Sequence, residues 1–252
     1  MSPETQRQLS KVPEVTIWFW MIKVAATTLG ETGGDSVSMS MHLGYLDATG
    51  IFAVLFLVAV ALQVAVKRFN PALYWTTIVA TTTVGTTLAD FADRSLGIGY
   101  AGGSTLLVGL LLLSLLLWYR SLGSVSIDTV STAPAEAFYW ITIMFSQTLG
   151  TALGDWTASS AGLGYVDAAI VFGGLLGVVY ALYRWTRASH VLLFWTAFVL
   201  TRPLGAVVGD FLDKPHALGG LALSRLAASA VILALMTLGI FAFPQRAAAR
   251  AH

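Results

Sequence analysis

A pattern of tryptophan, glycine and aspartate occurs four times along the chain and constrains the fold more than any other feature. The common frame is W-x7-[TP]-[LV]-G-x3-[GA]-D, and its copies begin at Trp20, Trp75, Trp140 and Trp195. Copies one and three share similar tails, as do copies two and four. Such self-similarity indicates a repeat architecture. We therefore predict two duplicated halves, residues 1–125 and 126–252, which together form a single membrane domain of four repeats.

The composition is that of an integral membrane protein. The chain is 56% hydrophobic and 11% charged, whereas soluble domains are about a quarter charged. Backbone groups in lipid must be bonded within their own segment, so we expect an all-α fold. Eight apolar segments approach the ~20 residues that a spanning helix needs, and they lie at about 14–34, 50–66, 72–92, 103–119, 136–155, 165–183, 190–210 and 221–243.

Charge is distributed unevenly between the two ends of this layout. Nine basic residues fall on one side and only Arg94, Lys214 and Arg225 on the other. By the positive-inside rule the nine are cytoplasmic, so both termini lie inside. The nine are Arg7, Lys11, Lys67, Arg68, Arg120, Arg184, Arg187, Arg246 and Arg250. Every motif then ends a helix that runs outward, which predicts four parallel helix hairpins. Residues 120–135 are predicted to form a cytoplasmic linker between the two halves.

The odd-numbered and even-numbered segments differ in polarity. The odd ones carry threonines and the charged residues Lys23 and Arg202, whereas the fourth is almost continuous leucine. We therefore expect helices 1, 3, 5 and 7 to form an inner ring and helices 2, 4, 6 and 8 to form a lipid-facing outer ring. The four motif tryptophans are predicted to form a belt at the membrane interface.

Small residues recur within each motif at a spacing that allows close helix packing. In lipid, pairs of small residues four apart let helix backbones approach each other. The motif glycines are Gly30, Gly34, Gly85, Gly150, Gly154, Gly205 and Gly209. We interpret them as packing residues that bring the ends of the odd helices together.

The motif aspartates are the candidate metal ligands. Asp35, Asp90, Asp155 and Asp210 end the four motifs, and Glu31 lies one turn deeper than Asp35. Hard cations prefer oxygen ligands of this kind. An alternative is that each aspartate only caps a hydrated helix end.

Lys23 and Arg202 place charge inside the predicted membrane region, where an unpaired charge is costly. Lys23 is expected to pair with a carboxylate, either as a coupling element that a bound cation displaces or as a structural ion pair. Arg202 is expected to act as a fixed charge that repels a cation or pairs with an aspartate; alternatively it satisfies carbonyls freed by Pro203. Neighbouring motif positions predict a polar axis formed by Thr27, Thr28, Thr82, Thr83, Gln147 and Thr148.

Catalytic motifs are not evident in the sequence, so we do not expect an enzyme or a resident cofactor. No phosphate-binding loop, zinc-spaced histidine set or nucleophile elbow is present. The absence of cysteine excludes thiolate metal sites. His42 and His216 are assigned to outer loops, where they either join a metal site or are only solvated.

The repeated T-L-G-x3-G-D signature, the aromatic pair before it and the eight-segment layout resemble a family of uncharacterised bacterial multi-pass inner-membrane proteins. That resemblance covers nearly the whole chain and implies a bacterial inner-membrane location. The stretch from Glu31 to Asp35 is also similar to the E-x-G-D signature of cation exchangers for manganese or calcium. It departs from that signature because three residues separate Glu31 from Asp35, and only one repeat carries the glutamate.

These features favour a membrane transporter of inorganic cations, with a divalent metal such as Mn²⁺ as its substrate. The expected partners are the lipid bilayer, the cation and protons as a coupling ion, and no nucleic acid. A pseudo-fourfold cation channel is the first alternative. A membrane sensor or scaffold that transports nothing is the second, in which the carboxylates only pack and cap helices.

Overall fold

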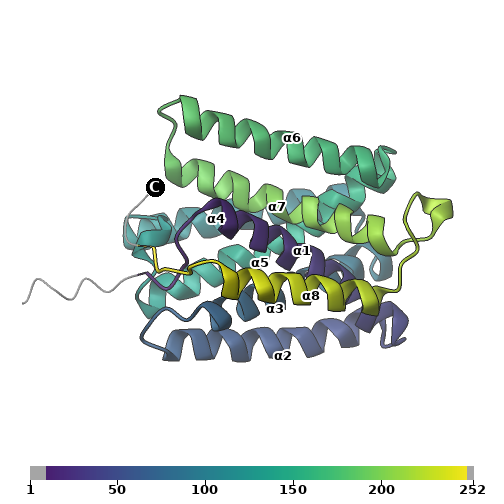
Figure 1. Cartoon of the computed structure of the whole chain (residues 1–252), viewed down its shortest axis with the longest axis horizontal. Helices are drawn as coiled ribbons and strands as arrows, with labels where there is room; N and C mark the ends of the chain where they lie inside the picture. Colours follow the sequence, from purple (N-terminus) through teal and green to yellow (C-terminus); the bar gives the residue numbers. More distant parts are fainter. Residues whose placement is uncertain (1–9, 249–252) are drawn as a thin grey trace, which may run out of the picture.

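The computed structural model describes residues 10–248, which form eight α-helices and contain no β-strand (Figure 1). The predicted all-α fold is confirmed. The predicted cytoplasmic residues Arg7 and Arg250 lie outside the described residues. The helices are α1 (Ile17–Asp35), α2 (Gly44–Ala65), α3 (Pro71–Asp90), α4 (Tyr100–Leu122), α5 (Ala133–Asp155), α6 (Gly164–Trp185), α7 (His190–Asp213) and α8 (Arg225–Ala242).

Polar side chains define where the odd-numbered helices begin. Asn70 accepts a hydrogen bond from the Leu73 amide at the start of α3, and Thr132 accepts one from the Ala135 amide at the start of α5. Thr16 and Ser189 cap α1 and α7 in the same way. An oxygen at this position satisfies one of the amides that the first helical turn leaves unbonded.

One glycine recurs 24 residues after each motif tryptophan and adopts a left-handed backbone. The φ angles are +78° at Gly44, +79° at Gly99, +74° at Gly164 and +85° at Gly219. Residues with a Cβ rarely adopt these angles, whereas glycine does so without a steric penalty. In the first three repeats this glycine reverses the chain at the start of α2, α4 and α6.

A short π-helical segment follows three of the four motif aspartates. These segments are Ser36–Ser40, Phe91–Ser95 and Trp156–Ser160, whereas α7 continues as an α-helix to Asp213. A π-helical turn is wider than an α-helical turn and is often found at functional sites. The helical turn that follows Asp35, Asp90 and Asp155 is therefore wider than the turns of the helix before it.

The odd helices contact one another, and each even helix covers one of them. Helix α1 packs against α3 and α7, and α5 packs against the same two helices. Helix α2 packs on α3, α4 on α5, α6 on α7, and α8 on α1; in Figure 1, α6 lies beside α7 at the top and α2 lies at the bottom. The main contacts between even and odd helices therefore join neighbouring repeats rather than the two helices of one predicted hairpin. The loop after each motif leads the chain to an even helix that lies beside the odd helix of the next repeat.

Within residues 10–248, five helices are long and apolar enough to cross a membrane: α2, α4, α6, α7 and α8, with mean hydropathies of 1.8 to 2.4. The four even helices expose large apolar side chains such as Leu55, Leu112, Ile170 and Leu235. Apolar surface of this extent indicates contact with lipid rather than water. Helices α1, α3 and α5 have similar lengths but carry more polar residues, and much of their surface is buried.

Aromatic residues form the core at the end of the bundle opposite the aspartates. Trp75, Trp140 and Trp195 are buried there. The predicted interfacial belt is therefore wrong for these three tryptophans, because the odd helices that carry them are enclosed by other helices. Nearby, the two ends of the described chain meet: the Glu14 amide donates to the Arg246 carbonyl, and the Ala248 amide donates to the Val12 carbonyl.

Candidate functional site

Four successive layers of side chains fill the space between the odd helices. They occupy positions 3, 7, 11 and 15 after each motif tryptophan, and this spacing of about one helical turn keeps them on one stripe of each helix. All sixteen side chains belong to residues that are at most 3% exposed. We call them the lysine layer (Lys23, Ile78, Ile143, Phe198), the arginine layer (Thr27, Thr82, Gln147, Arg202), the glutamate layer (Glu31, Thr86, Thr151, Ala206) and the aspartate layer (Asp35, Asp90, Asp155, Asp210).

The first glycine of each motif makes room for the arginine-layer residue of a neighbouring odd helix. A Cβ on Gly30 would overlap Thr82, and one on Gly85 would lie 2.9 Å from the backbone carbon of Gln147. In the same way Gly150 faces Arg202, and Gly205 faces Thr27. These contacts run in one direction from each repeat to the next and finally from the fourth repeat to the first.

The second small residue of each motif packs one turn further along. Gly34 faces Thr86, Gly154 faces Ala206 and Gly209 faces Glu31. The closest of these approaches is at Gly209, where an added Cβ would lie 2.7 Å from the Glu31 Cβ. Close backbone contact at two levels holds the polar layers between the helices.

Arg202 is the centre of the buried polar network. Its Nη2 lies 2.9 Å from Glu31 Oε2 and 2.6 Å from Thr86 Oγ1, and it also donates to Thr151 Oγ1. Its Nη1 lies 3.5 Å from the Thr27 carbonyl oxygen, at the limit of a hydrogen bond. One guanidinium from α7 thus contacts α1, α3 and α5, and it forms a charge-assisted pair with the glutamate.

Lys23 does not form the expected carboxylate pair. Within residues 10–248 its Nζ has no hydrogen-bond partner, and it lies 4.0 Å from the centroid of the Phe198 ring. The prediction is wrong because Glu31 lies eight residues, or about 12 Å of helix rise, further along α1. Arg202, from the intervening layer, reaches Glu31 instead. The face of an aromatic ring attracts an amine that carries a positive charge.

Two basic residues that were not among the predicted site residues hold the aspartate layer together. Arg94 Nε lies 2.8 Å from Asp90 Oδ1, and its Nη2 lies 3.2 Å from Asp155 Oδ2. Lys214 Nζ lies 2.9 Å from Asp210 Oδ1 and pairs also with Asp35. Each base follows its own aspartate by four residues, which places both on one helix face. That spacing is the sequence signal that could have identified them.

Lys214 acts as a fixed positive charge at the aspartate end. Burial by itself would lower the pKa of its ammonium, but the carboxylates of Asp210 and Asp35 outweigh burial and hold the pKa above its usual range. The group therefore stays protonated at neutral pH. Any cation that reached Asp35 or Asp210 would have to compete with this ammonium.

Carboxylates outnumber basic groups at this end of the bundle. Six buried carboxylates belong to Glu31, Asp213 and the aspartate layer. Four basic side chains pair with them in the described part of the chain: Arg94, Arg202, Lys214 and Arg225. Six carboxylates against four basic groups leave a formal charge of −2, which favours the binding of a cation.

Three carboxylates converge closely enough to share a metal ion. Glu31, Asp35 and Asp210 each offer an oxygen, and these oxygens lie within 4.8 Å of one another. Among the described residues, Asp35 Oδ1, Asp90 Oδ2 and Asp155 Oδ1 are buried without a hydrogen-bond partner. Buried carboxylate oxygens are normally bonded, so this end of the bundle has unused capacity to accept a ligand.

The remaining predicted polar residues differ in their hydrogen bonds, and the Thr82 hydroxyl has no partner among the described residues. Thr27 donates to the Thr201 carbonyl of α7 at 3.2 Å and so belongs to the interior network. Thr28, Thr83 and Thr148 instead donate to carbonyls four residues earlier in their own helices. Gln147 is fully buried, and no partner for its amide occurs within residues 10–248.

The two outer-loop histidines bond to their own loops. His42 Nδ1 lies 2.7 Å from the Met39 carbonyl oxygen, and His216 Nδ1 lies 2.8 Å from the Gly220 carbonyl oxygen. The three-carboxylate cluster found in the described residues includes neither of them.

Aromatic side chains extend the interior stripe beyond the lysine layer. Phe19, Tyr74, Tyr139 and Phe194 each directly precede a motif tryptophan, and all four are buried. The Tyr74 and Tyr139 hydroxyls are hydrogen-bonded at 2.6 Å. The interior is therefore carboxylate-rich at one end and closed by rings at the other.

Comparisons with known proteins agree with the repeat structure. Neither the curated proteins nor the solved structures contain a match to this chain. One family model, described as Repeat of Unknown Function (DUF347), matches residues 18–69, 73–124, 138–189 and 193–247. Each matched region starts two residues before a motif tryptophan, so the predicted four repeats are confirmed. The chain belongs to this DUF347 repeat family.

Proposed function

We propose that this protein is a multi-pass membrane transporter of inorganic cations, and that a divalent metal such as Mn²⁺ is its substrate. The observation that carries the proposal is the convergence of Glu31, Asp35 and Asp210 within 4.8 Å. Oxygen-only sites of this kind suit hard divalent cations. The formal negative charge of the surrounding groups adds electrostatic attraction.

In this proposal all eight helices cross the membrane. Helices α1, α3, α5 and α7 form the inner ring around the site, and α2, α4, α6 and α8 form the lipid-facing outer ring. The mutual contacts of the odd helices and the apolar surfaces of the even helices support this arrangement. The excess of basic residues at the aromatic end supports a cytoplasmic location for both termini, and the family resemblance supports a bacterial inner membrane.

Binding would proceed by competition between the substrate and tethered basic side chains. Lys214 and Arg94 occupy positions between aspartates that a metal ion would otherwise bridge. A divalent cation that displaces Lys214 from Asp35 and Asp210 gains both carboxylates and Glu31 as ligands. Release of the ammonium would then change the contacts between α7 and α1, which gives binding a route to conformational change.

A carrier is favoured over an open cation channel. The Arg202 guanidinium lies between the odd helices, one layer below the cluster, and is fully buried. A fixed positive charge there opposes the free passage of cations. The aromatic residues Phe19 and Tyr74 close the interior further along. Transport would therefore require a rearrangement of the helices rather than diffusion through a static pore.

Flux measurements in proteoliposomes test this function. We expect the wild-type protein to move Mn²⁺ in preference to Mg²⁺, Zn²⁺, Ca²⁺, K⁺ and Na⁺, with internal pH recorded at the same time to detect proton exchange. Asp35→Asn and Asp210→Asn are expected to abolish flux, because each removes a charged ligand. Asp47→Asn, on the exposed surface of α2, is the matched control and should transport normally.

Two outcomes would contradict the proposal. Normal flux through the Asp35→Asn/Asp210→Asn double variant would show that the cluster is not the transport site. The absence of flux for every ion in correctly inserted wild-type protein would favour the sensor or scaffold.

A further inference from the structure

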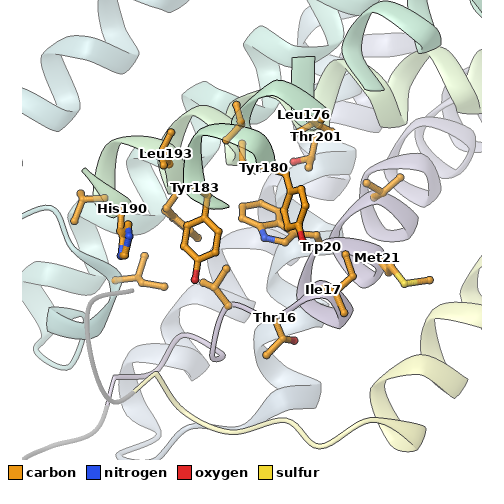
Figure 2. Close-up of a pocket in the computed structure, with 18 of the residues that line it drawn as sticks. Thr16, Ile17, Trp20, Met21, Leu176, Tyr180, Tyr183, His190, Leu193 and Thr201 are labelled. Atoms are coloured by element: carbon orange, nitrogen blue, oxygen red, sulfur yellow. The ribbon is translucent and has the colours of Figure 1, made fainter. Parts of the chain in front are cut away.

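A large pocket opens on the side of the bundle between α1, α6 and α7, away from the carboxylate cluster (Figure 2). Its volume is about 870 Å³, within the range of small-molecule sites. Most of its lining is apolar, with Trp20 and Val24 from α1, Leu176 and Val179 from α6, and Ala197 from α7. Concave apolar surface on a membrane-facing side must be filled by something other than water.

The length of the pocket corresponds to one leaflet of a bilayer. Along α7 its lining runs from His190 to Thr201, and this rise of eleven residues is about 16 Å. Half of a hydrocarbon core of ~30 Å is about 15 Å. The shallow end, at the start of α7, lies on the basic side of the molecule, so the pocket extends from the level of the headgroups toward the middle of the membrane.

Polar and basic groups gather at that shallow end. Tyr183 and His190 line it with their rings 5.1 Å apart, and Figure 2 shows them side by side. The segment that joins these two residues carries Arg184 and Arg187, both exposed. Guanidinium groups near a membrane surface attract anionic lipids and bind phosphate oxygens in pairs.

We propose that this pocket is a binding site for an anionic phospholipid. An acyl chain lies along α6 and α7 against Trp20, and the headgroup phosphate lies at Arg184, Arg187 and His190. The apolar lining selects the chain, whereas the two arginines select the negative headgroup. The site is separate from the carboxylate cluster, and its existence does not depend on what that cluster transports.

Lipid binding to the full-length protein tests this proposal. The protein is purified in detergent, stripped of lipid and titrated with dioleoyl phosphatidylglycerol or dioleoyl phosphatidylcholine, and bound lipid is counted by native mass spectrometry. We expect one phosphatidylglycerol to bind much more tightly than phosphatidylcholine. In Arg184→Gln/Arg187→Gln this preference should fall by about 25-fold, or about fivefold for each basic side chain lost. Lys67→Gln/Arg68→Gln, which removes two exposed charges from the α2–α3 loop, should keep the preference.

A second pair of variants separates the pocket from general contact with lipid. Gly177 lines the pocket on α6, and a Cβ added there meets no atom within 4 Å, so Gly177→Phe is expected to place its ring in the pocket. Gly109→Phe, at an equally open position on α4, is the control. Loss of the tight lipid in Gly177→Phe alone would support the site. Equal binding of both lipids by the wild type, or retained binding in Gly177→Phe, would overturn it.

Discussion

The buried pair of Arg202 and Glu31 allows a quantitative test of the interior network. Replacing Arg202 by methionine leaves the Glu31 carboxylate buried without its cation, and losses of this kind cost about 3–5 kcal/mol. The two threonines that also accept from Arg202 do not add to this cost. Thr86 still donates to the Thr82 carbonyl at 3.1 Å, and Thr151 still donates to the Gln147 carbonyl at 3.5 Å. The expected loss of stability in Arg202→Met therefore comes from the unpaired Glu31 carboxylate.

A double variant should recover most of that loss. Glu31→Met/Arg202→Met removes both charges and keeps similar side-chain volumes, and apolar replacement of a whole buried ion pair is often neutral or stabilising. Glu31→Met alone leaves the Arg202 guanidinium without its carboxylate and should cost a similar amount. We expect the double variant to be within about 1 kcal/mol of the wild type, which implies a coupling of about 5 kcal/mol or more between the two residues.

Reversible unfolding in mixed dodecyl maltoside and dodecyl sulfate micelles measures this coupling. The wild type, both single variants and the double variant are compared, with Asp47→Asn as a surface control. A coupling below about 1 kcal/mol would refute the view that the two charges depend on each other. So would an Arg202→Met variant as stable as the wild type.

Three further predictions follow from the packing and charges of the interior. Gly150→Ala should destabilise the protein by about 1–3 kcal/mol in the same unfolding assay, because the new Cβ overlaps Arg202. Gly33→Ala is the control and should not destabilise the protein, since a Cβ at Gly33 meets no atom within 4 Å. Equal effects of the two substitutions would contradict the packing. Lys23→Met should stabilise the protein by about 1 kcal/mol or more, because it removes a buried amine that has no hydrogen-bond partner within residues 10–248, and a clear loss of stability would refute this. If basic side chains compete with the substrate, Arg94→Gln should bind Mn²⁺ more tightly in calorimetric titration, and weaker binding would exclude that competition.

Much of the fold could be predicted because it depends on local, repeated signals. The motif marks the end of each odd helix, and α1, α3, α5 and α7 all extend through their motif aspartates. The apolar segments correctly indicated eight helices, although α2 begins at Gly44 rather than near residue 50. The recurring glycine 24 residues after each tryptophan was not recognised. Its function depends on a backbone angle, which composition does not reveal.

The contacts of the charged residues were harder to predict because they depend on which helices are neighbours. Lys23 and Glu31 lie on one helix, and their shared face suggested a pairing. Arg202, which lies 171 residues after Glu31 in the sequence, forms the ion pair with that glutamate instead. Likewise, the sequence placed Arg94 near acidic residues but could not show that it joins Asp90 to Asp155.

The two ends of the described part of the chain, near residues 10 and 248, meet, and this has a consequence for how the sequence can be rearranged. Residues Val12 to Glu14 pair with Arg246 to Ala248, and α8, the last helix, packs on α1, the first. No repeat is structurally first, since the fourth contacts the first much as each contacts its successor. A circular permutant that joins the old ends and opens the chain within residues 122–133 is therefore expected to keep the contacts between the helices.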